Sequence, residues 1–475
     1  MSEHAFRNRS RRAAGPVIAL SLAGLALLAA ACGSTGRVPG VTAAVAREIV
    51  TLDQIHELLA KGKLEAALEK TESYAADAPD KVDRRLVLAS VRASAGDLDG
   101  ARAATEEAKA LAPQSAEPWF FAAELASWSG DQAGRKAALD KALALDPAHA
   151  DVLAAYGDLH WEEGAYAKAE DSYRRAFAAD ATNLGALLGM GRAAYRKDDF
   201  KASASFLDRA VAAHPSSSLA RSDRARARYE LGRYLEALDD LDAAVELDPD
   251  SAWHRVERGQ LLLDFGRSDE ALADFSRAIE LDPSDFLPYV YRAGIHEEAG
   301  RDGEALADYK KLLALEPDYW YANESIGTVA FRSGDWKTAR EGFEAAFRMS
   351  PVQYEYAIMA AVSLARGGDA EGARALAEKV MPSVDREKFP AEWLALRLFY
   401  DRSGSTSEIE LRIGAETRLD MKAALLLWLG EYWIAKGRPE LGATYVGLSL
   451  ELDRQGTIWH RLAEAEAKRP GSAKP

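Results

Sequence analysis

The sequence predicts an all-α solenoid built from helical hairpins, on three observations. Hydrophobic residues make up 48% of the 475-residue chain, yet alanine and leucine supply most of them, and segments rich in valine, isoleucine and threonine that would indicate strands are missing. The chain is too long for a single compact core, so several domains or a repeat array are expected. A period of 34 residues favours the array, because Glu-Leu-Asp-Pro at 246–249 recurs at 280–283 and Leu-Glu-Pro follows at 315–317.

The first 31 residues have the pattern of an export signal. Four arginines between residues 7 and 12 precede an apolar run over residues 17–31, about the length expected of a signal peptide. The one cysteine of the chain, Cys32, follows directly, within Leu-Ala-Ala-Ala-Cys-Gly at 28–33. This segment resembles a bacterial lipoprotein signal. An ordinary transmembrane anchor is the alternative, although a spanning helix usually needs about 20 apolar residues.

The resemblance to a lipoprotein signal implies cleavage before Cys32 and attachment of acyl chains, palmitate among them, at that residue. Several acyl chains hold a protein permanently at a membrane, whereas one chain binds only marginally. Gly33 after the cysteine, in place of aspartate, implies sorting to the outer membrane, with the periplasmic face expected and the cell surface as the alternative. Residues 32–47 are small, polar and interrupted by a proline, so we expect a flexible tether there.

Ten units with a period of 34 residues are expected to run without insertion from residue 48, and the last one ends early at residue 381. A small residue recurs at the eighth position of nine units, where two helices must cross closely: Ala89, Ala123, Gly157, Gly191, Ala225, Gly259, Ala293, Gly327 and Ala361. Alanine recurs at the twentieth position: Ala67, Ala101, Ala169, Ala237, Ala271, Ala305, Ala339 and Ala373.

Start and stop residues share the period. Glycine recurs at the fifteenth position, where it would end the first helix, helix A, of each pair: Gly62, Gly96, Gly130, Gly164, Gly232, Gly266, Gly300, Gly334 and Gly368. Proline recurs at the thirty-second position, where it would stop the second helix, helix B: Pro79, Pro113, Pro147, Pro215, Pro249, Pro283, Pro317 and Pro351.

These columns resemble the tetratricopeptide repeat (TPR) family over residues 48–456. The resemblance implies a right-handed superhelix of about 12 helix–turn–helix units whose A helices line a concave groove. Departures from the pattern do not change the spacing. They include Arg135 and Ser203 in place of the alanine, Asp198 in place of the glycine, and Ala181 in place of the proline.

The register slips after residue 381. Residues 382–389 are expected to form a linker, and residues 390–456 two further, degenerate units. Residues 457–468 are expected to form a helix whose polar outer face caps the stack, because the end of a repeat array must be shielded from water. Residues 469–475 are expected to be a disordered tail.

Charge and motifs argue against catalysis and against nucleic-acid binding. The formal net charge is −15, and removal of residues 1–31 leaves 56 basic and 74 acidic side chains, or −18. Such a surface repels phosphate backbones and attracts basic partners. His56 and His296 each precede a glutamate but lack the second histidine, one helical turn later, that a metalloprotease needs. Without a phosphate-binding loop or a nucleophile elbow either, we expect no enzyme, no metal and no cofactor.

Arginines in the middle of the chain are expected to be structural. Three of them lie 34 residues apart at the seventh position, and three aspartates share that spacing at the twenty-third: Arg224, Arg258, Arg292, Asp240, Asp274 and Asp308. A partly buried charge persists only when it is paired. The register therefore predicts a ladder of ion pairs between helix A and helix B.

Partner proteins or peptides are expected in the groove that the TPR resemblance implies. The A-helix positions that face such a groove carry aromatic and charged residues, which are favoured binding anchors: Phe120, Glu124, Trp128, Asp158, Trp161, Arg192, Tyr195, Arg196, Arg226, Tyr229, Trp253, Gln260, Tyr321 and Phe331. The alternative is a purely structural role, in which these side chains fill space between neighbouring A helices. The expected function is a scaffold for a cell-envelope complex, and the alternatives are a surface adhesin or the regulatory subunit of a peptidoglycan enzyme.

Overall fold

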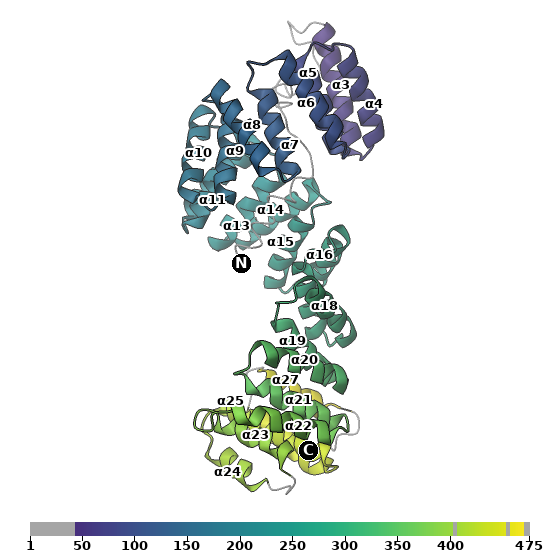
Figure 1. Cartoon of the computed structure of the whole chain (residues 1–475), viewed down its shortest axis with the longest axis vertical. Coiled ribbons are helices and arrows are strands. Elements are labelled where there is room, and N and C mark those ends of the chain that lie inside the picture. The colour runs from purple at the N-terminus through teal and green to yellow at the C-terminus, as the bar shows by residue number, and fades with distance from the viewer. Residues whose placement is uncertain (1–42, 402–405, 453–456, 470–475) are drawn as a thin grey trace. The chain divides into compact units, whose positions relative to one another are not determined.

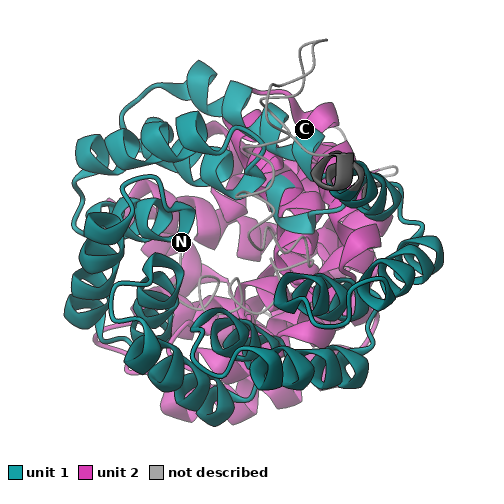
Figure 2. Ribbon diagram, turned by 90° about the horizontal axis from the view of Figure 1, so that it is seen from above, with its two compact units in different colours: residues 1–254 teal, residues 255–475 magenta. Residues whose placement is uncertain are grey.

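The computed structural model describes residues 43–401, 406–452 and 457–469. Within these ranges every regular element is helical, with 25 α-helices, one short 3-10 helix and no strand (Figure 1). The chain divides into two compact units, residues 1–254 and 255–475, which Figure 2 colours separately. Cys32, the expected signal peptide and most of the expected tail lie outside the described residues.

Unit 1 consists of consecutive helix pairs. Its helices are α3 (Ala43–Ala60), α4 (Leu64–Ala76), α5 (Val82–Ser94), α6 (Leu98–Leu111), α7 (Glu117–Trp128), α8 (Gln132–Leu145), α9 (Ala150–Glu162), α10 (Tyr166–Ala179), α11 (Leu184–Arg196), α12 (Phe200–Ala213), α13 (Ser218–Glu230) and α14 (Tyr234–Leu247). The boundary between the units falls within α15 (Ala252–Asp264).

Unit 2 continues the pairs and then departs from them. Its helices are α16 (Ser268–Leu281), α17 (Leu287–Glu298), α18 (Asp302–Leu315), α19 (Tyr321–Ser333), α20 (Trp336–Met349), α21 (Tyr354–Arg366), α22 (Ala370–Val380), the 3-10 helix η1 (Met381–Ser383), α23 (Pro390–Tyr400), α24 (Ser407–Ala415), α25 (Leu419–Ala435), α26 (Pro439–Leu452) and α27 (Ile458–Ala467).

Two expectations at the chain ends need correction. Helix α3 begins at Ala43, so the last five residues of the expected tether are helical. Their alanines favour a helix that the first unit then continues. Arg469, expected in a disordered tail, is held by Glu466 and by the carbonyl oxygen of Phe331.

The turn between helices A and B is set by two adjacent residues. All nine glycines of the fifteenth position have a positive φ, between 67° and 89°. At several units the next residue is an aspartate whose side chain accepts a hydrogen bond from a backbone N–H of helix B and so caps that helix: Asp97, Asp131, Asp199, Asp335 and Asp369. Helix A therefore stops, and helix B starts, at the same point in each of these units.

The small residue at the eighth position makes room for a large residue of helix B. A Cβ atom added to Gly157 would lie 2.3 Å from the ring of Tyr173, and one added to Gly189 of the next A helix would lie equally close to that ring. Phe275 and Phe343 lie against Gly259 and Gly327 in the same way. The column of small residues thus sets how closely each A helix approaches its B helix.

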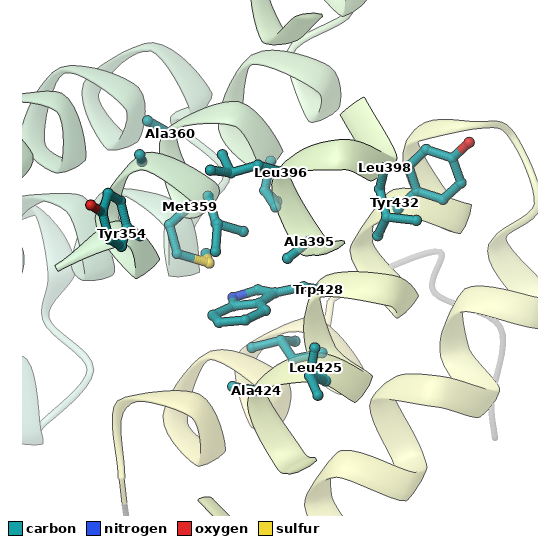
Figure 3. Packing of buried hydrophobic residues seen from close by; sticks show 14 of the residues in the cluster. Tyr354, Met359, Ala360, Ala395, Leu396, Leu398, Ala424, Leu425, Trp428 and Tyr432 are labelled. Carbon is teal, nitrogen blue, oxygen red and sulfur yellow. The ribbon is translucent and has the colours of Figure 1, made fainter. Parts of the chain in front are cut away.

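Among the described residues, the largest buried hydrophobic cluster extends from α19 to α27 of unit 2. Figure 3 shows the indole ring of Trp428 with Met359 and Ala395 on one side and Leu425 and Ala424 on the other. Trp459 of α27 packs edge-on against Trp428, with ring centroids 5.3 Å apart. This part of the chain has a continuous core in place of separate repeat-to-repeat contacts.

Candidate functional site

Aromatic residues expected in a groove form pairs across the turns of unit 1. Three of them, each at the twelfth position of its unit, meet an aromatic residue at the seventeenth position edge to face, with ring centroids 5.0–5.2 Å apart: Trp161 with Tyr166, Tyr195 with Phe200, and Tyr229 with Tyr234. Such pairs contribute about 0.5–1.5 kcal/mol beyond burial. We call these six residues the aromatic strip.

Arginines link successive pairs of the aromatic strip. The guanidinium of Arg196 lies 3.6 Å from the ring centroid of Tyr166, and that of Arg226 lies 5.4 Å from the ring centroid of Tyr195. The Tyr195 hydroxyl donates to Glu230 at 2.9 Å. Helix α11 contacts both α9 and α13, so the strip crosses three adjacent A helices.

Partial exposure distinguishes the strip from core. Tyr229 and Tyr234 are 39% and 48% exposed, and the other four rings are half-buried. A half-buried aromatic side chain is already held in one orientation and still presents a face to a partner.

A column of charged residues runs beside the strip at the ninth position, and Asp223 of the sixth position pairs with two of them. The column consists of Glu124, Asp158, Arg192 and Arg226. Asp223, which is 2% exposed, accepts from Arg192 Nε at 3.0 Å and from Arg226 Nη2 at 2.7 Å. Asp158 accepts from the Tyr173 hydroxyl at 2.8 Å. Burial raises the pKa of Asp158, and the nearby positive charge of Arg192 opposes this rise.

Glu124 of α7 continues this column toward the N-terminus. Burial raises the pKa of Glu124 to about 7, against the lowering effect of Arg135, while Asp158 adds to the rise. Arg135, which departs from the alanine column, is buried and extends to both carboxylate oxygens of Glu162 at 2.9 Å. The large side chain fits because it reaches into the next unit.

The central arginines of the expected ladder face the B helices. Arg224, Arg258 and Arg292 each donate through Nε and Nη2 to both oxygens of one buried carboxylate at 2.6–2.8 Å: Asp240, Asp274 and Asp308 respectively. Such two-point pairs fix the distance between the helices of one unit. These six residues hold helix A to helix B within each repeat and are not part of the aromatic strip.

The remaining expected groove residues differ among themselves. Phe120 packs on the core between α7 and α9, with its ring 5.9 Å from that of His149. Trp128, Trp253 and Gln260 are half-buried. Tyr321 is 57% exposed and stacks on Trp320 at 3.6 Å between centroids.

Phe331, also expected in the groove, is fully buried, and its helix α19 contacts α27. It nevertheless forms the same kind of pair as the strip, edge-on with Trp336 at 5.2 Å.

Sequence reasoning missed the second member of each aromatic pair. Tyr166, Phe200 and Tyr234 are spaced by 34 residues, so the signal was present. The buried carboxylate of Asp223 was missed as well, because it stands in no column of like residues.

A cavity of about 660 Å³ lies at the C-terminal end of unit 2. Glu355 of α21 and Glu392 of α23 line it together with Trp428 and Trp459. Burial raises the pKa of both carboxylates, and Glu392 raises that of Glu355 further. Because Trp459 belongs to α27, the shape of this cavity depends on the position of α27.

Neither a metal site nor a membrane span is found in the part of the chain that the structure describes. No group of three or more His, Cys, Asp or Glu residues there is arranged to hold an ion. None of the described helices is both long enough and apolar enough to cross a bilayer.

A family model described as "Tetratricopeptide repeat" matches residues 52–116, 135–183, 188–252, 256–319 and 325–383. Similar solved structures include MamA (23% identity, 34% of this chain and 94% of that chain, TM-score 0.31) and PilF of Pseudomonas aeruginosa (18%, 43% and 93%, TM-score 0.39). YrrB, a TPR protein with an unusual peptide-binding site, is a third (24%, 39% and 95%, TM-score 0.29). No curated protein matches the sequence.

Proposed function

Because this chain belongs to the tetratricopeptide repeat family, whose fold is typical of protein–protein interaction modules, we propose that it is a non-catalytic scaffold. The aromatic strip of unit 1 binds a segment of a partner protein. The observation that carries the proposal is the recurrence of half-exposed aromatic pairs on three successive units, each linked to the next by an arginine.

Energetics favour the strip over other surfaces of unit 1. Tyrosine, tryptophan and arginine dominate binding hot spots, because they bury a large area and lose little conformational freedom. The ion pairs of Asp223 already orient Arg192 and Arg226 before any partner arrives. Binding of a partner therefore costs little further side-chain entropy, because these side chains are already ordered in the folded protein.

The partner segment is expected to carry apolar side chains and a basic edge. The apolar side chains would pack on the rings of the aromatic strip. The basic edge would meet Glu124, Asp158 and Glu162, which gather beside the strip, and the chain as a whole is acidic. Association should then weaken as ionic strength rises.

We place this scaffold in the cell envelope, held by lipid at Cys32, and assign it to the assembly of an envelope complex. The support is the lipoprotein-like signal before Cys32. Protease treatment of intact cells separates this role from that of an adhesin, since only a surface protein would be cut. Recovery of a peptidoglycan synthase or hydrolase as the partner would favour the regulatory role.

Crosslinking in cells tests the binding surface. A photoreactive amino acid replaces Tyr229, and the control carries it at Asp239, an exposed residue on helix B of the same unit. We expect a discrete partner band from position 229 and none from position 239. Trp161→Ala should weaken that band at least threefold, because it removes the strip's first pair, two repeat units away, without touching the label. Equal bands from both positions, or a band from position 239 alone, would refute the assignment.

A further inference from the structure

Helix α27 does not extend the stack. A helix that merely continued a repeat array would contact only the pair before it. Helix α27 contacts α25 and α26, as that rule requires, and also α19, which belongs to a much earlier unit. Within unit 2 it lies beside α19 and α25 rather than beyond them (Figure 1).

Ion pairs hold α27 to helices far away in the sequence. Arg461 Nη1 lies 3.0 Å from Glu297 Oε1 of α17. Arg366 of α21 bridges Glu431 of α25 and Glu466 of α27, with Nη2 3.1 Å from Glu466 Oε1. All of these charges except Arg461 are buried or nearly so, so the geometry of α27 is specific.

Apolar and stacking contacts complete the surface of α17, α19, α21 and α25 that receives α27, which we call the seat of α27. Leu462 and Ala463 are fully buried. The ring of Trp336 has two guanidinium neighbours, Arg366 at 4.6 Å and Arg469 at 4.7 Å from its centroid. Arg469 Nη2 also donates to the carbonyl oxygen of Phe331 at 2.9 Å.

The residues that receive α27 stand at the same repeat positions as the aromatic strip and its linking arginine Arg196. Glu297 and Phe331 stand at the twelfth position of their units, Arg366 at the thirteenth, and Trp336 at the seventeenth. Trp161, Tyr195 and Tyr229 of the aromatic strip also stand at the twelfth position. Helix α27 therefore covers in unit 2 the counterpart of the surface that is partly exposed in unit 1.

We infer that the surface of α17, α19, α21 and α25 beneath α27 is a second binding site, which takes an amphipathic helix with an apolar face and a basic edge, and that α27 is a resident ligand which such a partner helix replaces. The chemistry is read from α27 itself: arginine toward Glu297, leucine and alanine toward the core, and arginine toward Trp336.

Two properties of α27 make exchange feasible. It has only ten residues, and isolated helices shorter than about 12–15 residues are marginal in water, so a released α27 loses its own structure. It is joined to α26 by the short segment 453–456, which gives it a high effective concentration at its seat. A partner helix must therefore have a high affinity for the seat, or a high local concentration, to compete with the tethered α27.

Competition with a synthetic peptide tests the inference. A fluorescent peptide of residues 457–469 is titrated into the full chain, and its Kd is compared among variants of α27 that leave the seat intact. Arg461→Glu removes one ion pair of the resident helix, and Leu462→Asp places a charge in the core. We expect the peptide to bind about threefold more tightly to the Arg461→Glu chain and at least tenfold more tightly to the Leu462→Asp chain than to the unaltered chain.

Control variants establish that the peptide occupies the seat of α27 and no other surface. Leu448→Asp alters a 42% exposed leucine of α26 and should leave the Kd of the unaltered chain unchanged. A peptide that itself carries Leu462→Asp should not bind. Hydrogen exchange should show release of α27 in the Leu462→Asp chain with α19 and α21 still protected. Failure of the peptide to bind that chain, or equal Kd values for all variants, would overturn the inference.

The aromatic strip has its own readout in the same experiment. Tyr229→Ala should leave binding of the 457–469 peptide unchanged, because the two sites lie in different units. A large loss of peptide binding in the Tyr229→Ala chain would show that the peptide had bound to the strip and would also overturn the inference.

Discussion

Asp198 carries a backbone strain that every other unit avoids. It is the one non-glycine residue with a positive φ, 58°, in the described ranges, and it stands where nine other units have glycine. A left-handed conformation costs an L-residue roughly 1–2 kcal/mol, less for aspartate. We expect Asp198→Gly to stabilise α11 and α12 by about 0.5 kcal/mol, measured by urea unfolding. Asp171→Gly, inside α10, should instead destabilise by about 0.3 kcal/mol, and a loss of stability in Asp198→Gly would contradict this account.

Arg292 tests the ion-pair ladder. Asp308 is buried and accepts two hydrogen bonds from Arg292. The other basic side chain near Asp308 is His296, whose pKa is lowered by burial, so that it is neutral at pH 7. Arg292→Ala leaves a buried carboxylate without a counter-charge, which should cost about 3 kcal/mol. Arg277→Ala breaks an exposed pair with Glu280 and should cost less than about 0.5 kcal/mol. Equal losses in chemical denaturation would mean that the ladder contributes no more than a surface pair.

Glu124 should make unit 1 sensitive to pH. Burial raises its pKa from 4.5 in the unfolded chain to about 7, so the folded state keeps a proton that the unfolded state releases. Its stabilising contribution is fully present below pH 4.5 and is lost as pH rises through 7. We expect amides of α7 and α9 to lose about 2 kcal/mol of protection between pH 5 and pH 8 relative to the Glu124→Gln chain. Parallel pH profiles for the two chains would exclude this role.

At the level of the helix pair, the Tyr173 ring fixes the approach of α9 and α11 to α10. A methyl group at Gly189 would enter the space of that ring, and overpacking of this kind typically costs about 1–3 kcal/mol. Gly189→Ala should therefore raise the hydrogen-exchange rates of α10 and α11. Gly294→Ala is the matched control, since nothing lies within 4 Å of a Cβ atom there, and it should stabilise α17 by about 0.5–1 kcal/mol.

Local patterns of the helices were predictable, and their distant contacts were not. A glycine at the fifteenth position, followed in several units by a capping aspartate, fixes the turn from within one unit. A two-point ion pair needs only a constant spacing between two columns. The return of α27 depends on Glu297, Arg366 and Trp336, which stand at three different repeat positions and lie more than 90 residues before α27. The members of the aromatic strip on the A helices were predicted, and those on the B helices were not, because only A-helix positions were expected to face a groove.

Across the whole molecule, stability should be unevenly distributed. The described clusters of unit 1 each join a few neighbouring helices, whereas one cluster connects α19 to α27. Repeat arrays unfold in steps when coupling between neighbours is weak. We expect hydrogen exchange in rising urea to show α19–α26 protected to a higher concentration than the helices of unit 1. Simultaneous loss of protection in all helices would indicate a single cooperative block.

Each pair of the aromatic strip closes within one unit, across the turn that joins its own two helices. Gain or loss of a unit would therefore add or remove one complete pair and leave the rest as they were. The length of the strip is therefore proportional to the number of units, with one aromatic pair for every 34 residues. A longer partner segment could be accommodated by duplicating a unit, without redesigning any contact already made.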